Sequence, residues 1–120
     1  MINTKKINIS IQNELIELEE GTYNILIIGG WRVKLNSFLI TLRNIETGKI
    51  IYPRNTIWKY QTYLFKKRAK RIRILDIKEY GTYEIKFKNS ESVLLKKSNL
   101  FLSSFFQKPV SVSEIEIVIK

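Results

Sequence analysis

Apolar and polar residues alternate along much of this chain, and that alternation limits its fold more than any other feature. The clearest stretch is 83–88, where Tyr83, Ile85 and Phe87 alternate with charged residues. Successive side chains of a β-strand point to opposite faces of a sheet, so a period of two predicts a strand with one buried face. The same alternation places further apolar residues inward at Ile7, Ile9, Ile11, Phe38, Ile40, Leu42, Ile115, Ile117 and Ile119. We therefore expect an all-β fold.

Composition and turn spacing support the same fold class. The 120 residues include 20 Ile and seven Thr but only one Ala and one Met. β-Branched side chains pack well on a pleated surface, and the near absence of Ala removes the best helix former. Turn-forming residues separate many of the alternating stretches by about 8 to 12 residues. These features predict one domain over residues 1–120, a single β-sandwich of jelly-roll-like type with about eight to ten short strands.

Individual segments give more specific predictions. Residues 25–28 are apolar at every position, which favours a central strand covered on both faces. Residues 43–50 predict a hairpin in which Gly48 takes a positive φ. The alternation at the end of the chain turns Val118 outward. At most one short helical turn is expected, near residues 98–106, and a buried loop is the alternative there.

A short motif occurs twice. Residues 21–23 and 81–83 both read Gly-Thr-Tyr, each followed by an Ile two positions later, at a spacing of 60 residues. In both copies Gly turns the chain, Thr starts a strand, and Tyr places a ring under the turn with its hydroxyl near the backbone. Two related halves of the chain would produce this repeat, and so would a common way of starting a strand. Either origin predicts similar structural roles for the two strands.

The residue types exclude most enzyme mechanisms. The chain has no Cys and no His, so it lacks a thiolate nucleophile, the usual general base near neutral pH and the commonest metal ligand. The nearest pairs of acids are Glu19 with Glu20, before a turn, and Glu114 with Glu116, which point away from an apolar face. We expect these pairs to be solvated. The sequence therefore predicts a protein without catalytic, cofactor-binding or metal-binding residues.

Features of targeting are also missing from the sequence. No apolar run approaches the ~20 residues that a membrane-spanning helix needs. The apolar stretch of a secretory signal does not follow the charged residues near Met1. We expect a cytoplasmic protein that does not span a membrane.

The densest charge lies at residues 66–73, which hold six basic residues in eight. A basic segment beside exposed rings can follow a phosphate backbone while the rings stack on bases. The alternative is a solvated loop between two strands, whose charge keeps a sheet edge from pairing with other sheets. The alternation of Trp58, Tyr60 and Leu64 as a core face favours that alternative slightly. The candidate partner-binding residues are Tyr63, Phe65, Lys66, Lys67, Arg68, Lys70, Arg71 and Arg73.

Two further apolar features have both a structural and a functional interpretation. Trp31 and Trp58 could present flat rings to a sugar, but the apolar residues that alternate after each of them favour burial. Residues 100–106 concentrate apolar side chains in an irregular stretch, which is either core or a surface that binds a partner.

Net charge helps to rank the functions. The chain carries 21 Lys+Arg against 11 Asp+Glu, a formal charge of +10, although its high Lys, Ile and Asn content can partly reflect the nucleotide composition of the source genome. We expect a non-catalytic binding or assembly module whose partner is a protein, either an acidic surface or like subunits. Strands that are apolar on both faces favour a protein, since nucleic acid does not need such surface. The alternatives are a nucleic-acid-binding β-domain that uses residues 66–73 and, after it, a carbohydrate-binding module.

Overall fold

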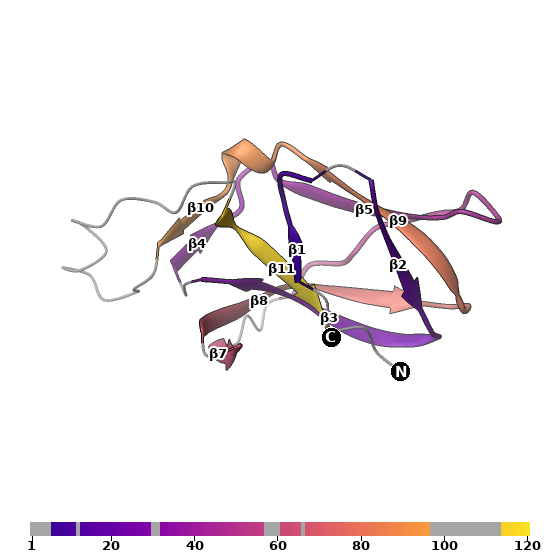
Figure 1. The fold of residues 1–120 in the computed structure, drawn as a ribbon, viewed down its shortest axis with the longest axis horizontal. Helices are drawn as coiled ribbons and strands as arrows, with labels where there is room; N and C mark the ends of the chain where they lie inside the picture. The colour runs from indigo at the N-terminus through magenta and orange to yellow at the C-terminus, as the bar shows by residue number, and fades with distance from the viewer. Residues whose placement is uncertain (1–5, 12, 30–31, 57–60, 66, 97–113) are drawn as a thin grey trace.

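The structure, a computed structural model, describes residues 6–11, 13–29, 32–56, 61–65, 67–96 and 114–120. These residues form eleven β-strands and one 3₁₀ turn, η1 at Ser90–Ser92, which confirms the all-β class (Figure 1). No helix in this part of the chain is long and apolar enough to cross a membrane. In chain order the strands are β1 Lys6–Asn8, β2 Glu14–Leu18, β3 Gly21–Ile28, β4 Arg32–Lys34, β5 Leu39–Asn44, β6 Ile50–Ile51, β7 Gln61–Leu64, β8 Lys67–Ile77, β9 Gly81–Lys88, β10 Leu94–Lys96 and β11 Glu116–Ile119.

The strands form three antiparallel sheets. A five-stranded sheet has the order β1-β11-β3-β8-β7, and a four-stranded sheet has the order β2-β9-β5-β6. The third sheet is the pair β10-β4. Neighbouring strands often come from distant parts of the sequence, because β1 pairs with β11 and β2 pairs with β9.

One hydrophobic core collects inward side chains from both of the larger sheets. It includes buried residues of β1, β2, β3, β5, β8, β9, β10 and β11. The inward positions predicted within residues 7–11, 38–42, 83–87 and 115–119 are buried in this core, with one exception. Ile11 is exposed, so its predicted inward position is wrong. The reason is that β1 ends at Asn8, where the chain turns and the Ile11 amide donates to the Asn8 carbonyl at 3.1 Å.

β3 is buried on both faces, as residues 25–28 predict. Alternate residues of this stretch face the main core, while Leu26 and Ile28 belong to a second buried cluster on the other face of the sheet. In the register of the sheet, Leu26 is opposite Val118 and Ile28 is opposite Ala69. Val118 therefore points away from the main core, as the alternation predicts, but it is fully buried in this second cluster.

Among the connections that link the two larger sheets, two are neighbours, and a tyrosine fixes each of these two. The first connection runs from β2 to β3, and the second runs back from β8 to β9. The Tyr23 hydroxyl donates to the Glu19 carbonyl at 2.8 Å and accepts from the Glu19 amide at 3.1 Å. The Tyr83 hydroxyl donates to the Glu79 carbonyl at 2.7 Å. Both bonds span four residues, so the two Gly-Thr-Tyr copies have the same structural role, as predicted.

The hairpin predicted at residues 43–50 is confirmed as the β5–β6 connection. Gly48 has a φ of 76°, in the left-handed region that favours glycine. Asn44 organises the loop from inside, because its side-chain Oδ1 accepts from the amides of Glu46 and Thr47 at 2.9 and 3.1 Å. The Asn44 side chain is buried. The sequence does not predict this burial, because a polar residue at the end of a strand is usually exposed.

One of the remaining structural predictions is wrong, and the others fall outside the described residues. The solvated-loop interpretation of residues 66–73 is wrong, because residues 67–73 belong to β8, which lies between β3 and β7. Its backbone groups pair with two strands at once, and that pairing holds charged residues in a regular strand. The expected helical turn at 98–106, the apolar patch at 100–106, and Trp31 and Trp58 lie outside the described residues.

The two tyrosine hydroxyls are expected to contribute measurably to stability. Tyr23→Phe removes both bonds to Glu19 and should lower the free energy of unfolding by about 1 to 2 kcal/mol. Tyr83→Phe removes one bond, so its effect should be smaller. The measurement is urea unfolding followed by circular dichroism.

Tyr80→Phe is the matched control for both variants. Tyr80 is exposed, and its hydroxyl donates to Glu17 at the surface, so the loss of that bond should change stability little. If Tyr23→Phe and Tyr80→Phe unfold at the same urea concentration, the hydroxyl of Tyr23 does not stabilise the first crossing.

Candidate functional site

The predicted partner-binding residues lie in one hairpin, apart from Lys66, which is outside the described residues. β7 and β8 are antiparallel, and Leu64 is opposite Lys67, so the turn that joins them is short. Phe65 has a φ of 52°, the left-handed conformation that such a turn requires. Tyr63 and Phe65 are 59% and 50% exposed. The hairpin therefore does present aromatic rings near cations.

The pleat of β8 divides the cations between two faces. Arg68 is opposite Tyr63 and shares its face, and Lys70 lies on that face as well. Lys67 and Arg71 point to the other face. Consecutive basic residues in the sequence thus do not form one continuous cationic surface. The structure brings together Tyr63, Arg68 and Lys70, and it separates them from Lys67 and Arg71.

A β-bulge changes the direction of the strand at its basic end. Ile25 is opposite Arg73 while the next residue of β3, Leu26, is opposite Arg71, so Ile72 is the extra residue. Ile72 is buried in the main core. Arg73 is half-buried, its Nη1 donates to the Ile72 carbonyl at 2.8 Å, and burial lowers the pKa of its guanidinium from the ordinary value.

Other groups of the hairpin also bind within the protein. Arg71 donates from Nη1 to Asn24 Oδ1 at 3.1 Å and from Nη2 to Thr56 Oγ1 at 3.5 Å. The Nζ of Lys6, on β1, lies 5.1 Å from the centre of the Phe65 ring, a cation–π contact between opposite edges of the five-stranded sheet. Leu64 packs on the second buried cluster. The contacts of Arg71 and Phe65 hold the β7–β8 hairpin over the face of the sheet that carries the second buried cluster.

The outer face of the four-stranded sheet combines exposed apolar residues with cations. Leu15, Glu84, Arg43 and Ile50 are register partners in one row across its four strands. Leu15 and Ile50 are 53% and 49% exposed at the two ends of that row. Between them, Arg43 and Glu84 form an ion pair at 3.4 Å.

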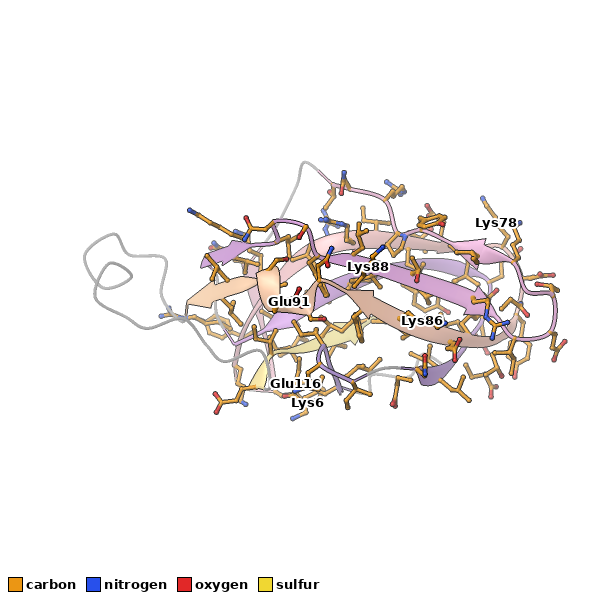
Figure 2. The ribbon with its side chains drawn as sticks, turned by 90° about the horizontal axis from the view of Figure 1, so that it is seen from above. Lys6, Lys78, Lys86, Lys88, Glu91 and Glu116 are labelled. Atoms are coloured by element: carbon orange, nitrogen blue, oxygen red, sulfur yellow. The ribbon has the colours of Figure 1, made fainter. Side chains whose placement is uncertain are left out.

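The next rows of the same face add positive charge. Lys86 and Lys88 follow one another along β9 (Figure 2), and Lys88 is opposite Leu39, which is 53% exposed. Lys86 approaches Glu84 at 3.8 Å, so this carboxylate is shared between Arg43 and Lys86. Lys88 has no ion pair with any described residue. The alternation along β9 predicts these outward positions, but only strand pairing places them beside Leu15, Leu39 and Ile50.

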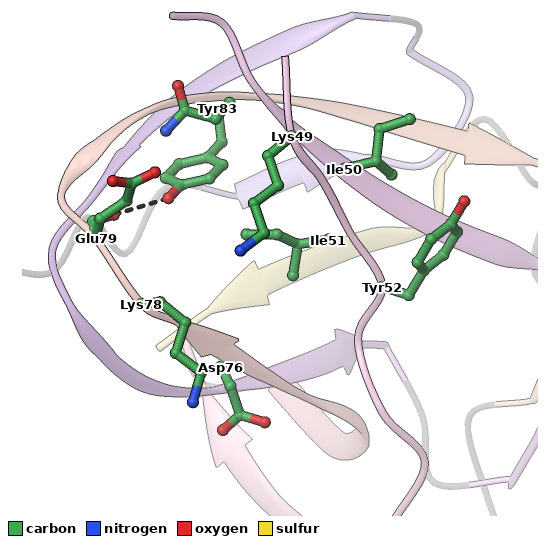
Figure 3. Close-up of a pocket in the computed structure, with 9 residues that line it drawn as sticks. Lys49, Ile50, Ile51, Tyr52, Asp76, Lys78, Glu79 and Tyr83 are labelled. Atoms are coloured by element: carbon green, nitrogen blue, oxygen red, sulfur yellow. Dashed lines mark hydrogen bonds between the residues drawn. The ribbon is translucent and has the colours of Figure 1, made fainter. Parts of the chain in front are cut away.

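A pocket of about 500 Å³ opens between the β5–β6 hairpin and the β8–β9 connection (Figure 3). Buried Tyr83 and half-buried Ile51 contribute apolar surface to it. Gly81 allows the strands to approach here, because a Cβ at this residue would lie 2.9 Å from Asn44 Nδ2. Sequence reasoning did not identify the pocket, since its two walls are more than 20 residues apart and only the fold joins them. Its lining residues are Asn44, Lys49, Ile50, Ile51, Tyr52, Asp76, Lys78, Glu79 and Tyr83.

Asp76 is the most constrained carboxylate of the pocket. One of its oxygens accepts from Arg54 Nε at 2.8 Å and the other from Thr22 Oγ1 at 3.2 Å. The Arg54 backbone is itself fixed, because its amide and carbonyl both bond to Ile74 of β8. The hydrogen bond from Arg54 is the main reason that the pKa of Asp76 lies below its ordinary value.

The acidic pairs singled out in the sequence are not enclosed. Glu19, Glu20 and Glu114 are exposed, and Glu116 is half-buried. Within the described part of the chain, no three acidic side chains are grouped so that they could hold a metal ion.

Comparison with known proteins gives no assignment. No protein-family model matches the chain, and no curated protein or solved structure shows significant similarity to it.

The Asp76 network predicts a pH effect on stability. A carboxyl group with a lowered pKa in the folded state contributes stability above its unfolded pKa of about 4, and that contribution is lost as the pH falls through the folded value. Asp76→Asn should therefore lose less stability than the wild type when urea unfolding is compared at about pH 6 and about pH 2. The difference should be small, because the carboxylate is partly exposed.

Glu91→Gln is the control for this comparison. Glu91 lies exposed in η1 and has no ion pair with any described residue. If Asp76→Asn and the wild type lose equal stability on acidification, the Arg54 bond does not stabilise the folded state.

Proposed function

We propose that this chain is a non-catalytic binding module that docks an acidic protein surface on the outer face of its four-stranded sheet. The observation that carries the proposal is the combination of half-exposed Leu15, Leu39 and Ile50 with Arg43, Lys86 and Lys88 on one face. Apolar side chains supply the area that a protein interface buries, and cations with few acidic neighbours attract a negatively charged partner.

The pairing of the strands supports a finer description of the fold, a single β-sandwich of jelly-roll type. β1 pairs with β11, β2 with β9, β3 with β8, and β5 with β6. Strands thus pair from the two ends of the chain inward, as they would in one long hairpin wound on itself. Successive pairs alternate between the five-stranded and four-stranded sheets. This nesting resembles the connectivity of a double Greek key, which supports the proposed jelly-roll type, although the β4–β10 pair lies outside it.

Charge distinguishes an acidic partner from assembly of like subunits. The chain has a formal charge of +10, so two copies repel each other. On the docking face the carboxylate of Glu84 already lies near both Arg43 and Lys86, and Glu17 accepts from Tyr80 at the far end. A second copy would bring further cations to this face, whereas an acidic protein would bring the missing carboxylates.

Nucleic acid is the second candidate, and the arrangement of the β7–β8 hairpin weakens it. A strand that follows a phosphate backbone needs its cations on one face. The basic residues of β8 instead point to both faces, and Arg71 and Arg73 donate to groups of the protein itself. Of the candidate residues predicted from the sequence, three share one face and still suit nucleic-acid binding: Tyr63, Arg68 and Lys70.

Charge reversal on the docking face should abolish binding of an acidic apolar probe. The probe is a fluorescent peptide of Glu-Glu-Leu repeats, compared with a peptide of Glu-Glu-Ser repeats that lacks the apolar side chains. We expect the Leu peptide to bind more tightly to the wild type, and Lys86→Glu with Lys88→Glu to weaken that binding by at least roughly tenfold. Fluorescence anisotropy at constant ionic strength gives the dissociation constants.

The matched control reverses two charges of β8, in the five-stranded sheet and away from the docking face, with Lys67→Glu and Arg68→Glu. Equal losses in the two double variants would mean that net charge alone drives binding, which contradicts a defined docking face.

Labelled single- and double-stranded oligonucleotides are titrated at about 50 and about 200 mM salt in parallel. If the wild type binds an oligonucleotide in a salt-sensitive way and the Lys67 and Arg68 variant does not bind it, the partner is nucleic acid and not an acidic protein. A defined oligomer in analytical ultracentrifugation would favour assembly of like subunits.

A further inference from the structure

β2, at one edge of the four-stranded sheet, has the features of a strand that can pair with a partner. Its five residues, Glu14–Leu18, pair with β9 on one side in a register without a bulge. Native proteins protect sheet edges from pairing by short edge strands, Lys, Pro or bulges. β6, at the other edge of the same sheet, is only two residues long, whereas β2 has none of these protections. Of the two edges of this sheet, β2 is therefore the one that another strand can extend.

The hydrogen-bond pattern of the sheet identifies the backbone groups on that edge. Antiparallel partners alternate between pairs that exchange backbone hydrogen bonds and pairs that do not. The Ile45 amide donates to the Thr82 carbonyl at 3.1 Å, so Thr82 bonds toward β5. The next residue of β9 therefore bonds toward β2, where Ile16 is its register partner. The backbone groups of Leu15 and Glu17 point the other way, to the edge, and they bond to no other described segment.

The side chains along this edge are apolar and acidic. Leu15, which is 53% exposed, and Glu17 point to the outer face of the sheet. Residues 14–20 hold four Glu and no Lys or Arg. Glu17 accepts from the Tyr80 hydroxyl, and neither Glu17 nor Glu20 forms an ion pair with a described residue. In a chain with a formal charge of +10, this edge is thus locally negative and attracts cations.

We infer that the β2 edge binds an extended basic segment of a partner protein, which adds to the sheet as an antiparallel strand. The backbone groups of Leu15 and Glu17 hold this segment, since main-chain hydrogen bonds supply the affinity in strand addition. A Lys or Arg of the partner lies opposite Glu17 and an apolar residue lies opposite Leu15, because such cross-strand pairs are favourable. A second copy of the chain would instead bring four more Glu to this edge. This inference rests on the β2 edge and does not depend on the docking of an acidic protein to the sheet face.

The test is a titration of the full chain with the peptide Thr-Lys-Val-Leu-Val-Thr, blocked at both ends, up to about 2 mM. In the antiparallel register its Lys lies opposite Glu17, and its Leu lies opposite Leu15. Hydrogen exchange of the amides, followed by ¹H–¹⁵N NMR, should slow about twofold at Leu15 and Glu17 at half saturation, because bound peptide protects these two amides. The Ile16 amide, which already bonds to β9, is the internal reference. Glu17→Lys should weaken binding by roughly three- to tenfold.

Glu91→Lys is the matched control, since Glu91 is also an exposed glutamate but lies in η1. It changes the net charge equally and should leave peptide binding unchanged. Absence of protection at Leu15 and Glu17, or equal losses in the two variants, would overturn the inference.

Two further peptides test the backbone bonds and the charge of the partner. A peptide with N-methyl groups on its Lys and Leu cannot donate to β2, and a peptide with Glu in place of Lys has the wrong charge. Either peptide binding as tightly as the first would also overturn the inference. Lys86→Glu with Lys88→Glu leaves the β2 edge intact, so this result is separate from that of the acidic peptide.

Discussion

The hydrogen bonds from two tyrosine hydroxyls to the carbonyls of Glu19 and Glu79 hold two neighbouring connections at which the chain changes sheets. A strand that leaves one sheet for another loses its ladder partners at the crossing, and a buried carbonyl there must find another donor. A tyrosine that bonds back to the backbone a few residues upstream is a recurrent solution at such a corner. Because β2 pairs with β9 and β3 pairs with β8, the two crossings are neighbours, and together they fix the relative position of the larger sheets.

The position of each strand in the two larger sheets determines which face its charged side chains occupy. Along β9 the register keeps Tyr83, Ile85 and Phe87 in the core, so Lys86 and Lys88 point to the outside of the four-stranded sheet. Along β8 the strand is central and bulged, so its cations point to both faces, and some of them bind groups of the protein. The densest cluster of charge in the sequence is therefore divided between two faces of its sheet.

The local sequence pattern predicted the features in which the role of each residue depends on its neighbours in the chain. The alternation in β9, the apolar stretch at residues 25–28, the turn at Gly48 and the two tyrosines are all of this kind. It failed at residues 66–73, because the period of two is broken by the bulge at Ile72 and charged residues hide the strand. It placed Val118 on the correct face but did not predict its burial, because the second cluster that covers this face is formed by other strands.

The candidate sites could not be predicted because each is built from segments far apart in the chain. Leu15 and Ile50 belong to one row only through the pairing of β2 with β9, β9 with β5, and β5 with β6. The pocket likewise needs the β5–β6 hairpin beside the β8–β9 connection, with Gly81 small enough to admit Asn44. Since the same Tyr83 that fixes the β8–β9 connection also lines the pocket, the residue that organises the fold also shapes this cavity.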